Sequence, residues 1–137
     1  MPVPVPVPVS GSCPAQVTGY TLVDAESATD IMPLRSYEMG NVPELLAIRV
    51  DIRACSPKVV ESVFIDFDGM TRCESFAPYT AFGDASKEDR ANNQAKYNGK
   101  AISAGRHVIK ATPYTGDRCS GTAGRTHTLE FTVSEPY

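Results

Sequence analysis

The sequence predicts an all-β fold, an antiparallel β-sandwich of about seven strands. Segments in which apolar and polar residues alternate recur along the chain, and clusters of Gly, Pro, Asn and Asp separate them. No segment has the longer apolar period of a helix. With 137 residues, the chain has the length of one domain with its own hydrophobic core.

The first part of the chain predicts a strand, a long loop and a second strand. Residues 17–25 have apolar positions at Val17, Tyr20 and Leu22 and are expected to form the first strand. Residues 25–44 are polar and contain Pro and Gly, so they are expected to form a loop. Residues 45–55 alternate cleanly, and their predicted buried face consists of Leu46, Ile48, Val50 and Ile52.

The remaining strands follow the same alternation. Residues 59–69 form the next expected strand, and Asp68-Gly69 predicts a hairpin turn after it. Residues 71–84 are expected to form a short edge strand because they contain Pro78. A highly polar segment, 85–100, precedes two more expected strands at 106–116 and 126–135. The inward positions of these three main strands are Val63, Ile65, Phe67, His107, Ile109, Ala111, Leu129, Phe131 and Val133.

The N-terminal segment alternates Pro and Val. Proline fixes φ, removes a backbone donor and pushes the preceding residue toward an extended conformation, which excludes a helix and a central strand. Three uses remain open: a spacer, an edge strand paired on one side, or a polyproline-type ligand for a neighbouring protein. We therefore divide the chain into a stem, 1–12, and a sandwich domain, 13–137. The stem residues expected to act in assembly are Pro2, Val3, Pro4, Val5, Pro6, Val7, Pro8 and Val9.

Charge and cysteine content limit the class of protein. A net charge of −3 does not favour nucleic-acid binding, and no apolar run approaches the roughly 18 residues of a membrane span. The four cysteines form no C-x-x-C pair, and the two histidines lack metal-like spacing, so no metal or cofactor is expected. Two disulfides in an oxidising, extracellular compartment are expected instead, with free buried thiols as the alternative.

The strand segments resemble an immunoglobulin-like β-sandwich module of large secreted and surface proteins. Such modules occur in tandem or beside malectin-like carbohydrate-binding domains. The resemblance covers about Val17 to Val133 and implies an immunoglobulin-like antiparallel sandwich with a spacing, adhesion or assembly role and no shared catalytic residue. The cysteines and the Pro-Val stem depart from the pattern. The blocks that carry it are VTGYTLVDAESATDIMPL, LLAIRVDIRACSPKVVESVFIDFDG, RCESFAPYTAFGD, YNGKAISAGRHVIKATPY and THTLEFTV.

The implied topology also suggests how the cysteines pair. Cys55 and Cys119 would lie in loops at the same end of the sandwich, so a Cys55–Cys119 bridge is expected. Cys73 would lie near the opposite end, and Cys13 lies at the base of the stem. These two are expected to bond to each other or to join two copies of the chain.

Other candidate sites have simpler explanations. The acidic residues lack the spacing of a calcium loop, and we expect solvation of Asp66, Asp68, Asp84, Glu88 and Asp89. His107 and His127 are expected on strand faces, and no G-x-S-x-G motif marks a nucleophile, so no catalytic residue is assigned. The tyrosines are expected either to pack in the core or to stack on sugars. They are Tyr20, Tyr37, Tyr79, Tyr97, Tyr114 and Tyr137.

These observations predict a non-enzymatic, extracellular structural or adhesion module. Its expected partners are other copies of the chain or neighbouring domains of a larger surface protein. If the stem of one copy contacts the next, the chain would be a self-assembling subunit of a surface filament or appendage. The alternative is a carbohydrate-binding module of a secreted protein, with a glycan as the partner.

Overall fold

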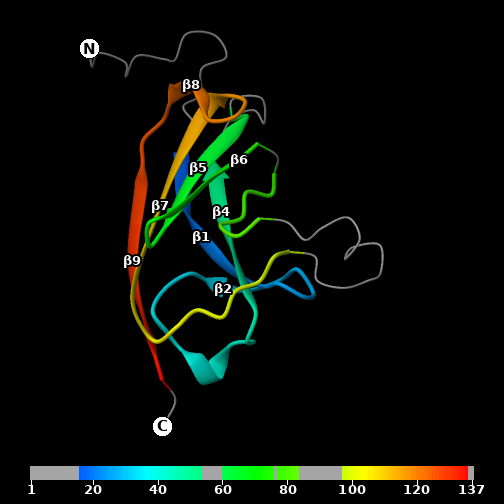
Figure 1. The fold of residues 1–137 in the computed structure, drawn as a ribbon, viewed down its shortest axis with the longest axis vertical. Coiled ribbons are helices and arrows are strands. Elements are labelled where there is room, and N and C mark those ends of the chain that lie inside the picture. The colour runs from blue at the N-terminus through cyan, green and yellow to red at the C-terminus, as the bar shows by residue number, and fades with distance from the viewer. Residues whose placement is uncertain (1–15, 54–59, 76, 84–96, 136–137) are drawn as a thin grey trace, which may run out of the picture.

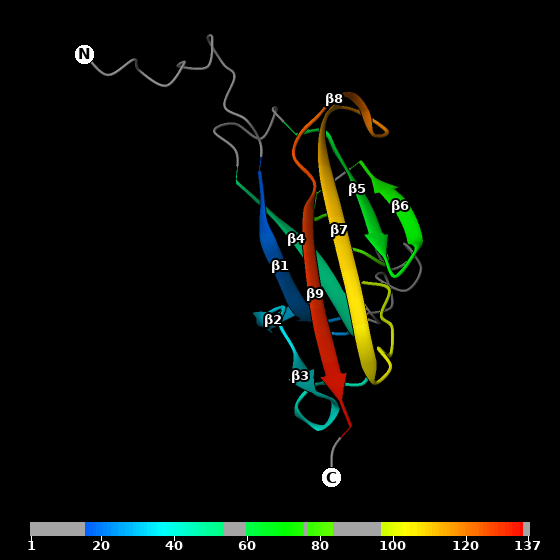
Figure 2. The same ribbon diagram turned by 90° about the vertical axis from the view of Figure 1, so that its left-hand side faces the viewer.

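The computed structural model describes residues 16–53, 60–75, 77–83 and 97–135. These residues form nine strands in two sheets and contain no α-helix (Figures 1 and 2). Buried side chains from both sheets make one core cluster between them. The predicted all-β sandwich is therefore confirmed, with more strands than the sequence indicated.

The smaller sheet has β1 (Gln16–Asp24) at its centre, between β2 (Thr29–Pro33) and β4 (Leu46–Arg53). Both pairings are antiparallel, and Gln16 lies opposite Arg53 where β1 begins. The predicted inner face of β4 is confirmed because Leu46, Ile48 and Val50 are buried.

The prediction of a loop over 25–44 is wrong. This segment forms β2, β3 (Tyr37–Glu38) and the 3-10 turn η1 (Met39–Asn41). Its few apolar residues explain the difference, because Leu34 and Tyr37 are buried and the Leu34 amide donates to the carbonyl of Tyr20 at 2.8 Å. Pro33 fits at the end of β2, an edge strand, where a missing donor is tolerated.

The larger sheet has the order β3-β9-β7-β5-β6. Its strands are β5 (Ser62–Phe67), β6 (Met70–Glu74), β7 (Gly105–Gly116) and β9 (His127–Ser134). β3 runs parallel to β9, and the other pairs are antiparallel. A further short strand, β8 (Ser120–Ala123), pairs with the end of β7 where the sequence predicted only a loop.

The strand predicted over 71–84 is shorter than expected. β6 ends at Glu74, and the chain then crosses from the larger sheet to the smaller one, where Thr80 forms a bridge with Arg49. Further along, Lys100 forms a bridge with Leu46. In the described part of the chain, this edge of β4 is therefore held by isolated bridges and not by a complete strand.

The described chain enters and leaves the sandwich at opposite ends. β1 begins at one end of the long axis, and β9 finishes at the other (Figures 1 and 2). The main strands of both sheets run roughly along this axis.

Candidate functional site

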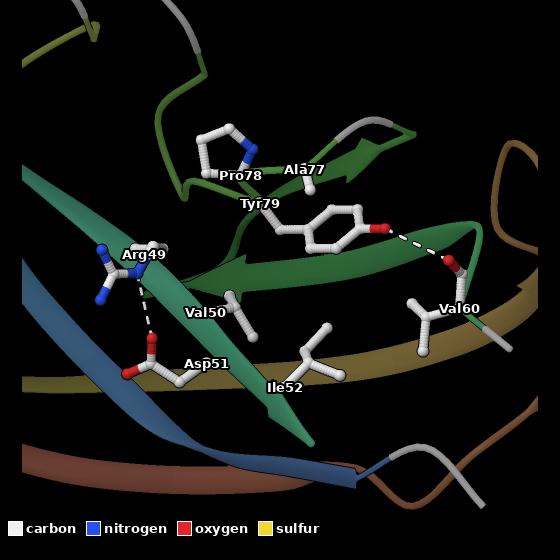
Figure 3. Close-up of a pocket in the computed structure, with 8 residues that line it drawn as sticks. All are labelled: Arg49, Val50, Asp51, Ile52, Val60, Ala77, Pro78 and Tyr79. Carbon is white, nitrogen blue, oxygen red and sulfur yellow. Dashed lines mark hydrogen bonds and ion pairs between the residues drawn. The ribbon is translucent and has the colours of Figure 1, made fainter. Parts of the chain in front are cut away.

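A groove of about 620 Å³ lies beside β4 (Figure 3). We call it the β4-edge groove. The described residues of its lining are mostly apolar and include no Ser, Cys or His. The lining residues are Arg49, Val50, Asp51, Ile52, Val60, Ala77, Pro78 and Tyr79.

The groove lies where the segment that crosses from β6 separates from β4. The Val50 amide donates to the carbonyl of Tyr79 at 2.8 Å, and the Ala81 amide donates to the carbonyl of Ile48 at 2.8 Å. No described residue forms a further backbone hydrogen bond to this edge of β4 toward Arg53. The space between the separating segments therefore borders a strand edge whose backbone groups have no hydrogen-bond partner among the described residues.

Apolar side chains from three segments line the inner side of the groove. Val50 and Ile52 come from β4, Val60 precedes β5, and the ring of Tyr79 lies above them (Figure 3). The Tyr79 hydroxyl donates to the carbonyl of Val60 at 3.4 Å, which holds the ring across the groove. Burial raises the pKa of Tyr79, and the negative charge of Glu61 adds to the effect. Tyr79 is therefore a neutral hydrogen-bond donor at physiological pH.

The outer side of the groove carries a network of paired charges. The Arg49 guanidinium donates to both carboxylate oxygens of Asp30, at 2.8 and 3.1 Å, and to Asp51 Oδ1 at 3.0 Å. Thr21 donates its hydroxyl to the other oxygen of Asp51 at 2.6 Å. The hydrogen bond with Asp30 is the main cause of a raised Arg49 pKa, which burial partly opposes. Because the guanidinium is engaged by two carboxylates, this wall does not favour a charged ligand.

A smaller cavity of about 230 Å³ lies near β3 and η1. Tyr37 lines it, and the Tyr37 hydroxyl is buried without a hydrogen-bond partner among the described residues. Burial raises the pKa of Tyr37 to about 12. The rest of the described lining is largely apolar apart from Glu44. Its other lining residues are Met39, Val42, Pro43, Glu44, Leu46, Ala101 and Ile102.

The predicted cysteine pairing is wrong. Cys73 on β6 and Cys119 at the turn between β7 and β8 form a disulfide, with their Cα atoms 6.1 Å apart. This bond excludes both the Cys55–Cys119 and the Cys13–Cys73 bridges. The β7–β8 turn bends back toward β5, where the Cys119 amide donates to the buried Ser62 hydroxyl at 2.7 Å. The same turn passes close to β6, which neighbours β5 in the sheet. The resemblance to an immunoglobulin-like sandwich did not indicate this proximity.

Cys13, Cys55 and the stem residues 2–9 lie outside the described residues. Asp84, Glu88, Asp89 and Tyr137 lie outside them as well.

Asp66 and Asp68, the two acidic candidates among the described residues, each take part in the β5–β6 turn. Asp66 on β5 accepts a hydrogen bond from the Gly69 amide at 2.8 Å, as expected for a residue that supports a turn. Asp68 lies in the turn itself, with a φ of 51°, and contacts His107 and the Val108 amide. Within the described ranges, no group of three or more His, Cys, Asp or Glu side chains is placed to hold a metal.

The histidines and the described tyrosines pack inside the fold or against it. His107 is buried on β7, while His127 contacts Tyr20, whose hydroxyl donates to the His127 carbonyl at 2.9 Å. Tyr97 covers a small apolar cluster on the outer face of the smaller sheet. Tyr79 alone among the described tyrosines lines the β4-edge groove.

Sequence reasoning did not identify the β4-edge groove. The available signal was the pair Pro78-Tyr79 within the expected edge strand 71–84, since proline interrupts pairing and leaves the aromatic ring beside an open edge. No described helix has the length and apolar character needed to cross a membrane.

The groove has to be interpreted from its own geometry. No protein-family model matches the chain, and searches of curated proteins and of solved structures found no significant match.

Proposed function

We propose that the chain is a non-enzymatic, extracellular structural and adhesion module that assembles into a surface filament or appendage. The observation that carries the proposal is the position of its two ends, since β1 begins and β9 finishes at opposite ends of the long axis (Figure 2). A module attached at opposite ends extends an array by its full length. A force along that axis is shared by the strand ladders, whose hydrogen bonds lie across the strands.

The strand order supports an immunoglobulin-like module as the basis of this function. Immunoglobulin-like domains place strands C, F and G side by side in one sheet. In this chain β5, β7 and β9 are neighbours in that order. Such sandwiches recur in many cell-surface proteins.

The disulfide supports an extracellular location. Disulfides persist in oxidising compartments and are rare in the cytosol. The Cys73–Cys119 bond joins an edge strand to a neighbouring hairpin, which restrains the margin of the larger sheet. This restraint suits a module that has to stay folded outside the cell.

Self-assembly is tested on the purified chain by sedimentation velocity over a range of concentrations, followed by electron microscopy. We expect larger, elongated species to grow with concentration. A chain that sediments as a monomer at every concentration, with no particles of regular shape, would contradict the proposal.

Carbohydrate binding is the second candidate, and the β4-edge groove is the observation that favours it. The Tyr79 ring faces apolar side chains, and hydrogen-bonding groups of Arg49 and Asp51 border the same groove. An aromatic ring beside a few polar groups is a common pattern in ligand sites. Calorimetry against a glycan panel separates the candidates: saccharide binding that Tyr79→Ala abolishes would favour this function, whereas Tyr97→Ala serves as the control.

A further inference from the structure

We propose that the β4-edge groove binds the Pro-Val segment, residues 2–9, of a second copy of the chain as an added β-strand. The inference rests on the proposed self-assembly and names the surface that performs it. The segment would pair with the end of β4 between Val50 and Arg53.

At the groove, the edge of β4 has backbone groups that no described residue pairs with. The Leu46 and Val50 amides donate across this edge, to Lys100 and Tyr79. Backbone groups of alternate residues in a strand point to the same edge, so the amide and carbonyl of Ile52 also point into the groove. No described residue bonds to them there. An exposed strand edge of this kind is a template for pairing with another chain.

A Pro-Val repeat suits one-sided pairing. In an extended chain, the prolines occupy one set of alternate positions and the valines the other. Along one edge of the extended segment, every valine offers both its N–H and its C=O. Along the other edge, the prolines offer a C=O but no N–H. The repeat can therefore add to one sheet edge, and its outer edge discourages the addition of a further strand.

The groove and the segment also match in polarity, and about half of the segment would cover the edge of β4. Residues 2–9 carry no charged side chain, and the Arg49 charge at the groove is already paired with Asp30 and Asp51. Val50, Ile52, Val60 and Tyr79 supply an apolar surface for the valine side chains. The end of β4 offers roughly 13 Å of edge, which about four extended residues cover.

The position of Gln16 favours a second copy over the chain's own stem. Gln16 pairs with Arg53 on the β1 side of β4, across the strand from the groove. β1 runs antiparallel to β4, so Gln16, where β1 begins, lies beside the last residue of β4. To reach its own groove, the stem would have to reverse direction around that end, whereas the stem of a neighbouring copy approaches without this constraint.

The test compares the wild-type chain with a variant that carries Val3→Pro, Val5→Pro, Val7→Pro and Val9→Pro. This all-proline stem remains extended and apolar but has lost the valine amides. We expect its association measured by sedimentation to weaken at least about tenfold, because strand pairing requires those donors. The peptide PVPVPVPV should dissociate wild-type assemblies, whereas octaproline should not. Ile52→Asp, with its fold checked by circular dichroism, should weaken association from the groove side.

The outcomes separate this inference from the proposed function. If the all-proline variant assembles as well as the wild-type chain, strand pairing at the groove is overturned while the structural role stands. If the wild-type chain is monomeric at every concentration, the self-assembly itself is contradicted. If the peptide dissociates the assemblies and the all-proline variant stays monomeric, the inference is supported.

Discussion

His107 Nδ1 and Asp68 Oδ2 lie 2.5 Å apart and join the β5–β6 turn to strand β7. Asp68 also accepts a hydrogen bond from the Val108 amide at 2.8 Å, and His107 Nε2 lies 2.7 Å from the carbonyl of Ser103. The buried imidazole stacks on Phe67 and Phe131, with ring centroids 5.6 and 5.4 Å away. A polar pair thus occupies an aromatic end of the core, where each partner satisfies the other.

Removal of the Asp68 carboxylate should destabilise the fold. Asp68→Ala leaves the buried His107 nitrogen and the Val108 amide without their acceptor, which should lower the free energy of unfolding by about 2–3 kcal/mol. Asp68→Asn should cost about 1 kcal/mol less, since Asn keeps an acceptor and tolerates the positive φ of this turn. Urea denaturation measures both values. Equal values for the two variants would contradict the role given to this side chain.

Tyr37 should make stability depend on alkaline pH. Its pKa is about 12 in the folded chain and about 10 when unfolded, so between these values the unfolded state binds fewer protons than the folded state. The Tyr37 contribution is therefore complete below pH 10 and is lost as pH rises toward 12. Tyr37→Phe should reduce this loss, which denaturation at several pH values would show.

The same variant tests the unpaired hydroxyl. Because no described group bonds to the Tyr37 hydroxyl, Tyr37→Phe should change stability at neutral pH by less than about 1 kcal/mol. Tyr20→Phe is the matched control and should cost about 1 kcal/mol, since it removes the hydrogen bond to the His127 carbonyl. A larger cost for Tyr37→Phe than for Tyr20→Phe would contradict the assignment.

Loss of the Cys73–Cys119 disulfide should destabilise the chain markedly. The bond closes a loop with a sequence separation of 46 residues. In the chain-entropy treatment, a loop of this length contributes about 4 kcal/mol. The double variant Cys73→Ser, Cys119→Ser should lower the free energy of unfolding by roughly this amount in chemical denaturation, while circular dichroism still shows a β-rich fold. Unchanged stability would indicate that the bond is dispensable.

The sequence predicts two disulfides, and Cys73 and Cys119 form one of them. If the second lies within the chain, it joins Cys13 to Cys55. The described residues favour this pairing because Gln16 pairs with Arg53. Cys13 lies three residues before Gln16, and Cys55 lies two residues after Arg53. Peptide mapping without reduction should recover a Cys13–Cys55 peptide pair. Free thiols at these positions, or a bond between two copies, would contradict this pairing.

Strand alternation explains why most of the fold was predictable. Most buried positions on β4, β5, β7 and β9 follow the period of two, since one face of each strand packs on the core. The loop assigned to 25–44 was wrong because two short edge strands depend on neighbours elsewhere in the chain. A local sequence pattern gives little sign of such pairing when only Ala25, Leu34 and Tyr37 are buried in this segment.

The candidate site was less predictable because it arises from long-range geometry. The Asp68-Gly69 turn was visible in the sequence, but the contact from Asp68 to His107 spans 39 residues and depends on the pairing of β5 with β7. The wrong cysteine pairing has a similar cause, since strand order alone does not say how far the β7–β8 turn bends toward β6. The groove could not be predicted because it depends on where the segment before Thr80 separates from β4.

Hydrogen exchange at the Ile52 amide tests the central claim most directly. If stems of neighbouring copies pair with the end of β4, exchange at Ile52 should slow as protein concentration rises. The Asp51 amide faces β1 and should be protected at every concentration, which provides an internal control. An Ile52 exchange rate that is independent of concentration while assemblies form would contradict the claim that this edge joins one copy to the next.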